Sequence, residues 1–153
     1  MENTDIISFR SVIDDSFIVT VVYPESDLYA DIKGMLDGIG GSIAALVVGK
    51  KMILVDGSGL EKIDEDQFKA IQAHEICHDI LGHTSELSES DEIEADLSAI
   101  HLLLELEENK ASESLSNRLL NQRGIKYNDH SLESILSGES LRLYRNYLTE
   151  MER

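Results

Sequence analysis

The chain has 153 residues, of which 42% are hydrophobic and 28% are charged, a composition typical of one folded, soluble domain. Thirteen basic against thirty acidic side chains leave a formal net charge of −17, which disfavours direct binding to nucleic acid or to an anionic membrane surface. The single cysteine excludes an internal disulfide framework and favours a reducing compartment. No apolar stretch is long enough for a membrane span. We therefore expect a cytoplasmic protein.

The first half of the chain predicts a small sheet. Residues 17–23 are rich in β-branched side chains, end before Pro24, the only proline, and predict a strand. Two further apolar runs flank a short turn that contains Gly49 and predict a β-hairpin. In chain order, the expected elements are a strand at 17–23, a helix at 25–37, hairpin strands at 42–48 and 52–55, and a loop at 56–59.

The second half of the chain predicts helices only. The first begins at Asp64, where Gln67 completes a capping box, and it ends at Gly82. Polar residues 83–90 form a loop before a second helix at about 91–108. Shorter helices are expected at 114–122, 132–136 and 140–151. A small sheet followed by helices is an α+β fold.

The residues that point to chemistry are His74-Glu75-Ile76-Cys77-His78, within the first of these helices. At 100° per residue, His74 and His78 lie about 40° apart around the helix and one turn apart along it, so both imidazoles can reach one metal ion. Glu75 lies on the shoulder of that face, where its carboxylate reaches a water on the metal more easily than the metal itself. We expect Ile76 and Cys77 to pack in the core. Two histidines at this spacing are, taken alone, also compatible with ordinary hydrogen-bonded side chains.

A third ligand is expected from the second helix, because catalytic zinc sites commonly use three protein ligands and a water. Glu92 and Asp96 are four residues apart and share a helix face. Glu92 can complete the metal site, while Asp96 accepts the other ring N–H of a ligand histidine. Ala95 and Ala99 are small where the two helices must approach closely. The alternative for both acids is a solvated helix face.

Together these motifs resemble those of a known family. HEICH at 74–78 followed by EIEAD at 92–96 resembles the gluzincin zinc metallopeptidases, in which HExxH precedes a glutamate-bearing helix. The likeness is greatest to the HtpX-like peptidases and their soluble minimal relatives, the minigluzincins. It covers about residues 42–104 and includes the hairpin, Asp64-Glu-Asp66 and Gly82-His83. ImmA/IrrE-type proteins, which also pair HExxH with a downstream acidic helix, are a more distant likeness.

The resemblance implies one Zn²⁺ per chain, with His74, His78 and Glu92 as its ligands. It implies that Glu75 acts as the general base and that Asp96 supports a ligand histidine. It further implies that a strand along the cleft pairs with the substrate backbone, and the residues at that place are Ser42, Ile43, Ala44 and Ala45. The family often has Asn-x-x-Ala where this chain has Ser-Ile-Ala-Ala, so a plain core strand is the alternative.

The same likeness divides the chain in two. Residues 1–111 would form a minimal zinc metallopeptidase domain, in which a small mixed sheet with its hairpin packs on the HExxH helix and on a second zinc-ligand helix. Residues 112–153 would form a helical C-terminal segment packed on that domain. Because minigluzincins have terminal segments that cover the cleft, this segment is either an inhibitory flap or a packed cap.

We therefore expect a zinc-dependent endopeptidase that cleaves a peptide or protein substrate. The acidic residues between Glu86 and Asp96 favour basic peptides. A second donor to the oxyanion is expected among five side chains, each with an ordinary structural role as its alternative: His83, His101, Tyr127, Tyr144 and Tyr147. Two other functions stay open, a regulatory ImmA/IrrE-type protein that acts on a repressor and a non-catalytic, zinc-stabilised interaction module.

Overall fold

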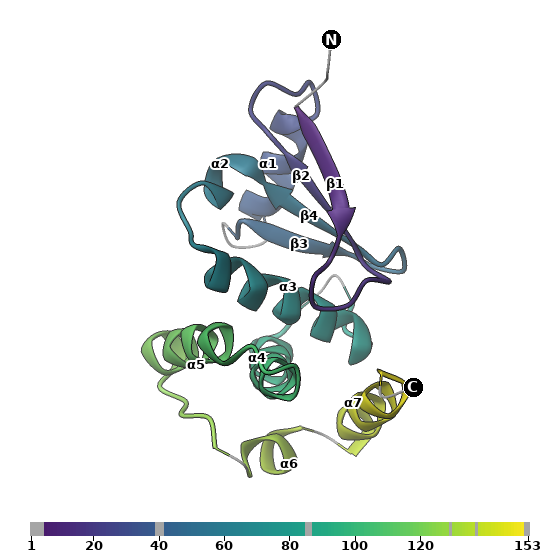
Figure 1. The fold of residues 1–153 in the computed structure, drawn as a ribbon, viewed down its shortest axis with the longest axis vertical. Helices are drawn as coiled ribbons and strands as arrows, with labels where there is room; N and C mark the ends of the chain where they lie inside the picture. Colours follow the sequence, from purple (N-terminus) through teal and green to yellow (C-terminus); the bar gives the residue numbers. More distant parts are fainter. Residues whose placement is uncertain (1–4, 39–41, 85–86, 129, 137, 152–153) are drawn as a thin grey trace.

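A four-stranded mixed sheet with helices packed below it confirms the α+β fold predicted from the sequence (Figure 1). This computed structural model describes residues 5–38, 42–84, 87–128, 130–136 and 138–151. The strands are β1 (Ile6–Arg10), β2 (Ile18–Val22), β3 (Ala44–Val47) and β4 (Met52–Asp56). The helices are α1 (Tyr29–Gly38), α2 (Gly57–Leu60), α3 (Glu65–Ile80), α4 (Glu89–Glu105), α5 (Asn109–Arg123), α6 (Ser131–Ile135) and α7 (Gly138–Met151). None of these described helices is both long enough and apolar enough to cross a membrane.

The strand order in the sheet is β1-β2-β4-β3. β2 and β4 pair in parallel, with α1 and the edge strand β3 lying between them in the chain. The other two pairs are antiparallel, and β3 with β4 forms the predicted hairpin, with Ala44 opposite Val55 and Val47 opposite Met52. β3 is therefore the last strand on its side of the sheet and has one edge without a strand partner among the described residues.

The strand β1 is one that the sequence analysis does not predict. Only its first residue is even partly buried, so the alternation of apolar and polar side chains is weak. Backbone pairing with β2 holds the strand in place. Phe9 adds an edge-on contact with Phe68 of α3, with ring centroids 6.2 Å apart. Pairing of this kind is a long-range property that a short local pattern does not reveal.

Three helix boundaries also differ from the prediction. α2 occupies part of the predicted loop, because the Asp56 carboxylate accepts the N–H of Ser58 and caps a single turn. α1 begins at Tyr29 rather than at residue 25, since the preceding residues form turns stabilised by Ser26. α5 begins at Asn109, five residues earlier than expected, and part of its first turn is buried in the core.

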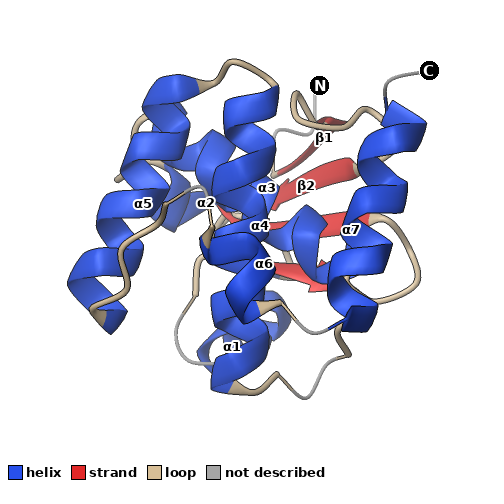
Figure 2. Cartoon of the chain, turned by 90° about the horizontal axis from the view of Figure 1, so that it is seen from below, coloured by secondary structure: helices blue, strands red, loops and turns tan. Residues whose placement is uncertain are grey.

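α3 lies between the sheet on one side and helices α4, α5 and α7 on the other. Figures 1 and 2 show α3 against the sheet, α4 beyond it, and α5 and α7 on opposite sides of α4. α3 contacts β3, α4 and α5, and all its residues from Gln72 to His78 are buried. Ala95 and Ala99 of α4 are fully buried, as expected for small side chains where two helices approach closely. The helix with the HExxH motif is thus held from both sides.

Capping boxes begin both helices that carry the site. The Asp64 carboxylate accepts the N–H of Gln67 at 2.8 Å, and the Gln67 side chain accepts the N–H of Asp64 at 3.0 Å, as predicted. Ser88 and Asp91 form the same pair of hydrogen bonds at the start of α4. Each box satisfies backbone N–H groups that have no partner within the helix.

Replacing Asp64 by alanine (Asp64→Ala) should lower the free energy of unfolding by about 1 kcal/mol, because it removes the cap of α3. Urea unfolding followed by circular dichroism should give a lower midpoint with an unchanged slope. The matched control is Asp66→Ala, which removes a carboxylate from the same first turn but no capping bond. Equal losses in the two variants would show that only the charge matters.

Candidate metal centre

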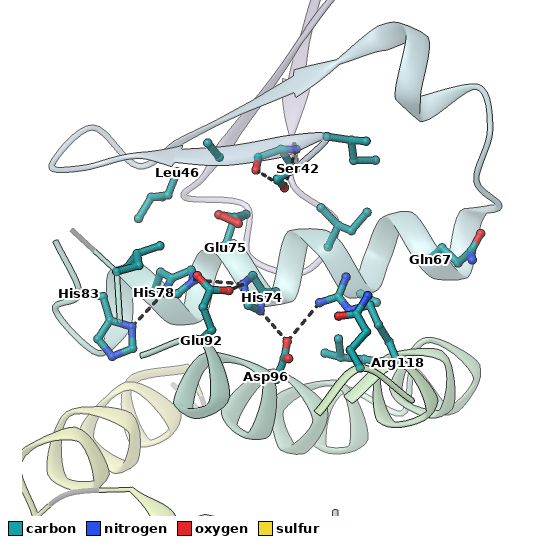
Figure 3. Close-up of a pocket in the computed structure, with 18 of the residues that line it drawn as sticks. Ser42, Leu46, Gln67, His74, Glu75, His78, His83, Glu92, Asp96 and Arg118 are labelled. Carbon is teal, nitrogen blue, oxygen red and sulfur yellow. Dashed lines mark hydrogen bonds and ion pairs between the residues drawn. The ribbon is translucent and has the colours of Figure 1, made fainter. Parts of the chain in front are cut away.

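Side chains from α3 and α4 converge on one point (Figure 3). His74 and His78 lie on successive turns of α3, with their Nε2 atoms 3.0 Å apart. Glu92, in the first turn of α4, places Oε2 3.2 Å from Nε2 of His74 and Oε1 3.2 Å from Nε2 of His78. These three residues could hold a metal ion.

The spacing and the chemistry of this group fit a tetrahedral divalent metal. Ligand atoms bonded to zinc at about 2.0–2.1 Å lie about 3.3 Å from one another, close to the separations found here. Two imidazole nitrogens and a carboxylate are a ligand set that zinc commonly takes. A cation between them would satisfy the Nε2 atoms of the two buried histidines together with the partly exposed carboxylate of Glu92.

The ring of His74 has a carboxylate on its other side. Its Nδ1 lies 2.7 Å from Oδ1 of Asp96, and Nη2 of Arg118 lies 3.1 Å from the same oxygen. Burial opposes the charged form of Asp96, but the hydrogen bond with His74 and the charge of Arg118 outweigh it and lower the pKa of Asp96. Burial also opposes charge on His74, yet Asp96 and Glu92 raise the pKa of His74 to about 10. The surroundings thus favour a positive charge at this point.

The ring of His78 has a second imidazole beside it. Its Nδ1 lies 2.9 Å from Nδ1 of His83. Gly82, with a φ of 71°, ends α3 and turns the chain back, so that the N–H of His83 donates to the carbonyl of His78 at 3.0 Å. Nε2 of His83 faces Glu94 at 3.1 Å and Asp91 at 3.4 Å. His83, Asp91 and Glu94 form a second group that could hold a metal ion.

Glu75 points from α3 towards β3, beside the converging ligands (Figure 3). It is only 7% exposed, and the backbone N–H of Leu46 donates a hydrogen bond to it. Burial raises the pKa of Glu75 above its ordinary value, although His74, His78 and the N–H of Leu46 oppose the rise. A carboxylate with a raised pKa next to a metal is suited to take up and return a proton.

A cleft of about 1250 Å³ opens above His74, His78 and Glu92, with β3 along one rim, α3 beneath, and α5 and the start of α4 along the other wall. All four residues of the predicted substrate strand line it, Ser42 and Ile43 just before β3 and Ala44 and Ala45 at its start. Leu46 adds an apolar side chain and Arg118 a positive one. The cleft therefore runs along β3.

The five candidate oxyanion donors differ in whether they line the cleft. Within the described part of the chain, His83 is the one that lines the cleft, and its ring faces His78. Tyr144 contacts His101 Nδ1 at 2.7 Å, and the Tyr147 hydroxyl donates to Asp14 at 2.7 Å, so both tyrosines attach α7 to the rest of the fold. Tyr127 does not line the cleft either.

The acidic residues expected to select basic peptides have partners of their own. Glu89 pairs with Arg123 at 3.1 Å, and Asp96 pairs with Arg118. Glu86 lies outside the described residues. A preference for basic substrates stays a prediction.

The C-terminal segment contributes unequally to the cleft. α5 forms part of its wall, whereas no described residue after 123 lines it. The predicted domain boundary after residue 111 lies inside α5, and both this boundary and the role of residues 112–153 as a flap or cap stay predictions.

Two residues of the site were not found by sequence reasoning. Arg118 reaches Asp96 only because α5 packs on both α3 and α4, a contact without a local signal. Glu94 lies inside the EIEAD motif, but on a different face from Glu92 and Asp96, where it meets His83. The place of Glu94 within the motif marks it as a candidate, but no local pattern indicates that it contacts His83.

Comparisons of the chain with models of protein families, with curated protein sequences and with solved structures give no match. Two groups among the described residues could hold a metal ion, and one of them contains both HExxH histidines.

Titration with Zn²⁺ should show one tight site per chain, and His74→Ala or His78→Ala should weaken it at least about 100-fold, because each removes one of three protein ligands. Metal present at about 1,000 times its Kd stabilises the fold by about 4 kcal/mol. Chelation should therefore lower the Tm of the wild-type protein by more than that of these variants, for which a 100-fold weaker site leaves about 1.4 kcal/mol at the same metal concentration. Calorimetric titration and thermal unfolding measure the two effects.

The matched control for this titration is His130→Ala, which removes an exposed histidine elsewhere and should leave zinc binding unchanged. Asp91→Ala tests the second group, because Asp91 belongs only to that group. Zinc binding lost in Asp91→Ala but kept in His74→Ala would place the metal at the second group instead.

Proposed function

We propose that this chain is a zinc-dependent endopeptidase of the gluzincin type, similar to the HtpX-like peptidases and minigluzincins. The observation that carries the proposal is the convergence of His74, His78 and Glu92 next to buried Glu75, in a cleft under an edge strand. A metal-ligand triad, a carboxylate base and an open strand edge are what hydrolysis of an extended peptide needs. We place the enzyme in the cytoplasm, with peptide or protein substrates, in line with its single, buried and unpaired cysteine.

In this proposal His74, His78 and Glu92 hold one zinc ion, which when bound lowers the pKa of a water to about 7 and polarises the scissile carbonyl. Glu75 takes a proton from the attacking water as the water oxygen bonds to the carbonyl carbon. Glu75 then gives that proton to the amide nitrogen as the C–N bond breaks, so that a carboxylic acid, which keeps the second proton of the water, and an amine leave. Burial raises the pKa of Glu75, which makes it a stronger base for the first of these steps.

The free edge of β3 supplies the backbone groups for the substrate. The N–H of Asp56 donates to the carbonyl of Ile43 at 2.8 Å, so Ile43 directs its backbone groups towards β4. Orientation alternates along an antiparallel strand, and Ala44 and Leu46 therefore direct their N–H and C=O groups to the free edge. A peptide that binds by strand addition would pair with these two residues, and at Leu46 it would take the N–H that Glu75 accepts in the free chain.

The side chain of Ser42 covers part of this edge. Its hydroxyl donates to the carbonyl of Ala44 at 2.8 Å and lies 3.3 Å from the N–H of the same residue. A substrate strand that pairs with Ala44 must displace that hydroxyl. Ser42 thus competes with the substrate for the strand edge.

Arg118 is a further substrate contact in this proposal. One nitrogen of its guanidinium donates a hydrogen bond to Asp96, and its side chain remains 35% exposed on the wall of the cleft. A guanidinium has five N–H donors, so others stay available for a substrate carbonyl. One side chain would then both support the partner of His74 and orient the peptide.

Glu75→Gln should retain zinc but lose peptide cleavage by about 100-fold or more, because the amide cannot take the proton of the water. A diverse peptide mixture incubated with the zinc-loaded protein, with new termini read by mass spectrometry, measures the loss. Zinc content is checked in parallel.

The matched control for this variant is Glu113→Gln, the same exchange at an exposed position of α5, which should cleave like the wild type. Unchanged cleavage by Glu75→Gln would refute the mechanism. Zinc binding without cleavage by the wild type would refute the peptidase proposal and leave a zinc-binding module.

Ser42→Ala should lower KM by about two- to tenfold with kcat unchanged, because a hydrogen bond of about 0.5–1.5 kcal/mol no longer competes with the substrate. Steady-state kinetics on a peptide found in the mixture separates KM from kcat. The control is Ser26→Ala, at a turn serine that does not line the cleft. A raised KM would mean that the Ser42 hydroxyl binds the substrate itself.

A further inference from the structure

The two histidines of the metal centre differ in what contacts their Nδ1 atoms. Nδ1 of His74 faces a carboxylate oxygen of Asp96, which can only accept when ionised. Nδ1 of His78 faces Nδ1 of His83 at 2.9 Å. Two imidazole nitrogens at this distance form a hydrogen bond only if one carries a proton and the other does not.

A histidine that binds metal through Nε2 keeps its ring proton on Nδ1. In the proposed zinc site, His78 therefore donates from Nδ1, and Nδ1 of His83 accepts. A neutral His83 then carries its own proton on Nε2, which faces carboxylate oxygens of Glu94 at 3.1 Å and Asp91 at 3.4 Å. Every donor in this chain of contacts meets an acceptor.

Contacts of both its backbone and its ring fix the position of His83. Gly82 turns the chain in the left-handed region and brings the His83 backbone onto the carbonyl of His78. The side chain of His83 is 6% exposed, and Glu94 is buried against the Ser140 hydroxyl of α7 at 3.3 Å. The ring is therefore held at both its nitrogens and at its backbone.

We propose that His83 is a positioning residue of the metal centre. Its Nδ1 accepts the ring proton of His78 and so holds the plane of that ligand and directs its Nε2 at the metal. Glu94 and Asp91 select the required tautomer of His83. This inference rests on the zinc site of the proposed function. It also explains what Gly82 and His83, which belong to the family resemblance, would do: Gly82 forms the turn, and His83 orients His78.

The same geometry argues against two metal ions bound together. A metal on Nε2 of His83, within the second group, would leave the ring proton on its Nδ1. That proton would face the Nδ1 proton of a metal-bound His78 across 2.9 Å. Occupation of one group therefore opposes occupation of the other, and the second group acts as a hydrogen-bond partner of the first.

Two substitutions test the contacts of the two ring nitrogens of His83 separately. In His83→Asn the amide oxygen takes the place of Nδ1 and can still accept from His78. In His83→Gln the amide reaches the place of Nε2 and can still meet Glu94, but nothing accepts from His78. We expect His83→Gln to lose about 10- to 100-fold in zinc affinity and His83→Asn to stay within about threefold of the wild type.

Zinc affinity is measured by competition with a chromogenic chelator, and the visible spectrum of the Co²⁺-loaded protein reports the ligand geometry. The spectrum should be altered in His83→Gln and preserved in His83→Asn. His130→Asn, at an exposed histidine, is the control for the exchange itself. Thermal unfolding of the metal-free proteins checks that the variants fold.

The reverse order of affinities would overturn the inference, since it would assign His83 to the contact with Glu94 and α7. Equal affinities in all proteins would also overturn it, as would equal losses in both variants with lowered metal-free stability. A wild-type chain that binds no zinc would refute this inference and the proposed function together. Tight zinc binding without peptide cleavage would refute only the proposed function.

Discussion

The burial of polar side chains on α3 is the constraint on which the rest of the structure depends. His74, Glu75 and His78 are 9%, 7% and 2% exposed, and a buried polar group without a partner costs about 1–3 kcal/mol. None of the three finds its partners within α3 alone. α4 brings Glu92 and Asp96 to the imidazoles, and the backbone of β3 brings an N–H to Glu75. The layers around α3 therefore complete a polar cluster as well as a core.

The support of the two histidines is unequal. Asp96 is a buried carboxylate whose pKa is lowered by His74 and, to a smaller extent, by Arg118, and such a partner raises the basicity of the ring on which it acts. The partner of His78 is a neutral imidazole in the arrangement proposed above, which orients the ring with less effect on its charge. In the proposed zinc site His74 would be the stronger donor, and His78 the one whose direction depends on the turn after α3.

Local periodicity explains what the sequence could predict. Four-residue spacing on a helix places His74 and His78 on one face, and the same rule places Glu92 and Asp96 together. The capping residues at Asp64 are equally local. The meeting of the two helix faces follows once the loop between them lets α4 return along α3. These parts of the fold and of the site need little knowledge of tertiary structure.

What the sequence did not reveal is long-range. β1 exists through pairing with β2 and has almost no buried side chain to mark it. Arg118, on α5, lies 22 residues beyond its partner Asp96 in the sequence. The relation between His78 and His83 spans only five residues, but it depends on the left-handed turn at Gly82 and on Glu94. Such contacts are set by packing, which no periodic pattern records.

The edge of β3, which no described strand pairs with, also bears on how copies of this protein meet. An exposed strand edge is a template for pairing with another chain and thus for aggregation. Here the Ser42 hydroxyl occupies the outward groups of Ala44, and Glu75 occupies the outward N–H of Leu46. A net charge of −17 adds repulsion between copies. The strand edge proposed to bind a peptide is therefore protected against pairing with the same edge of another copy.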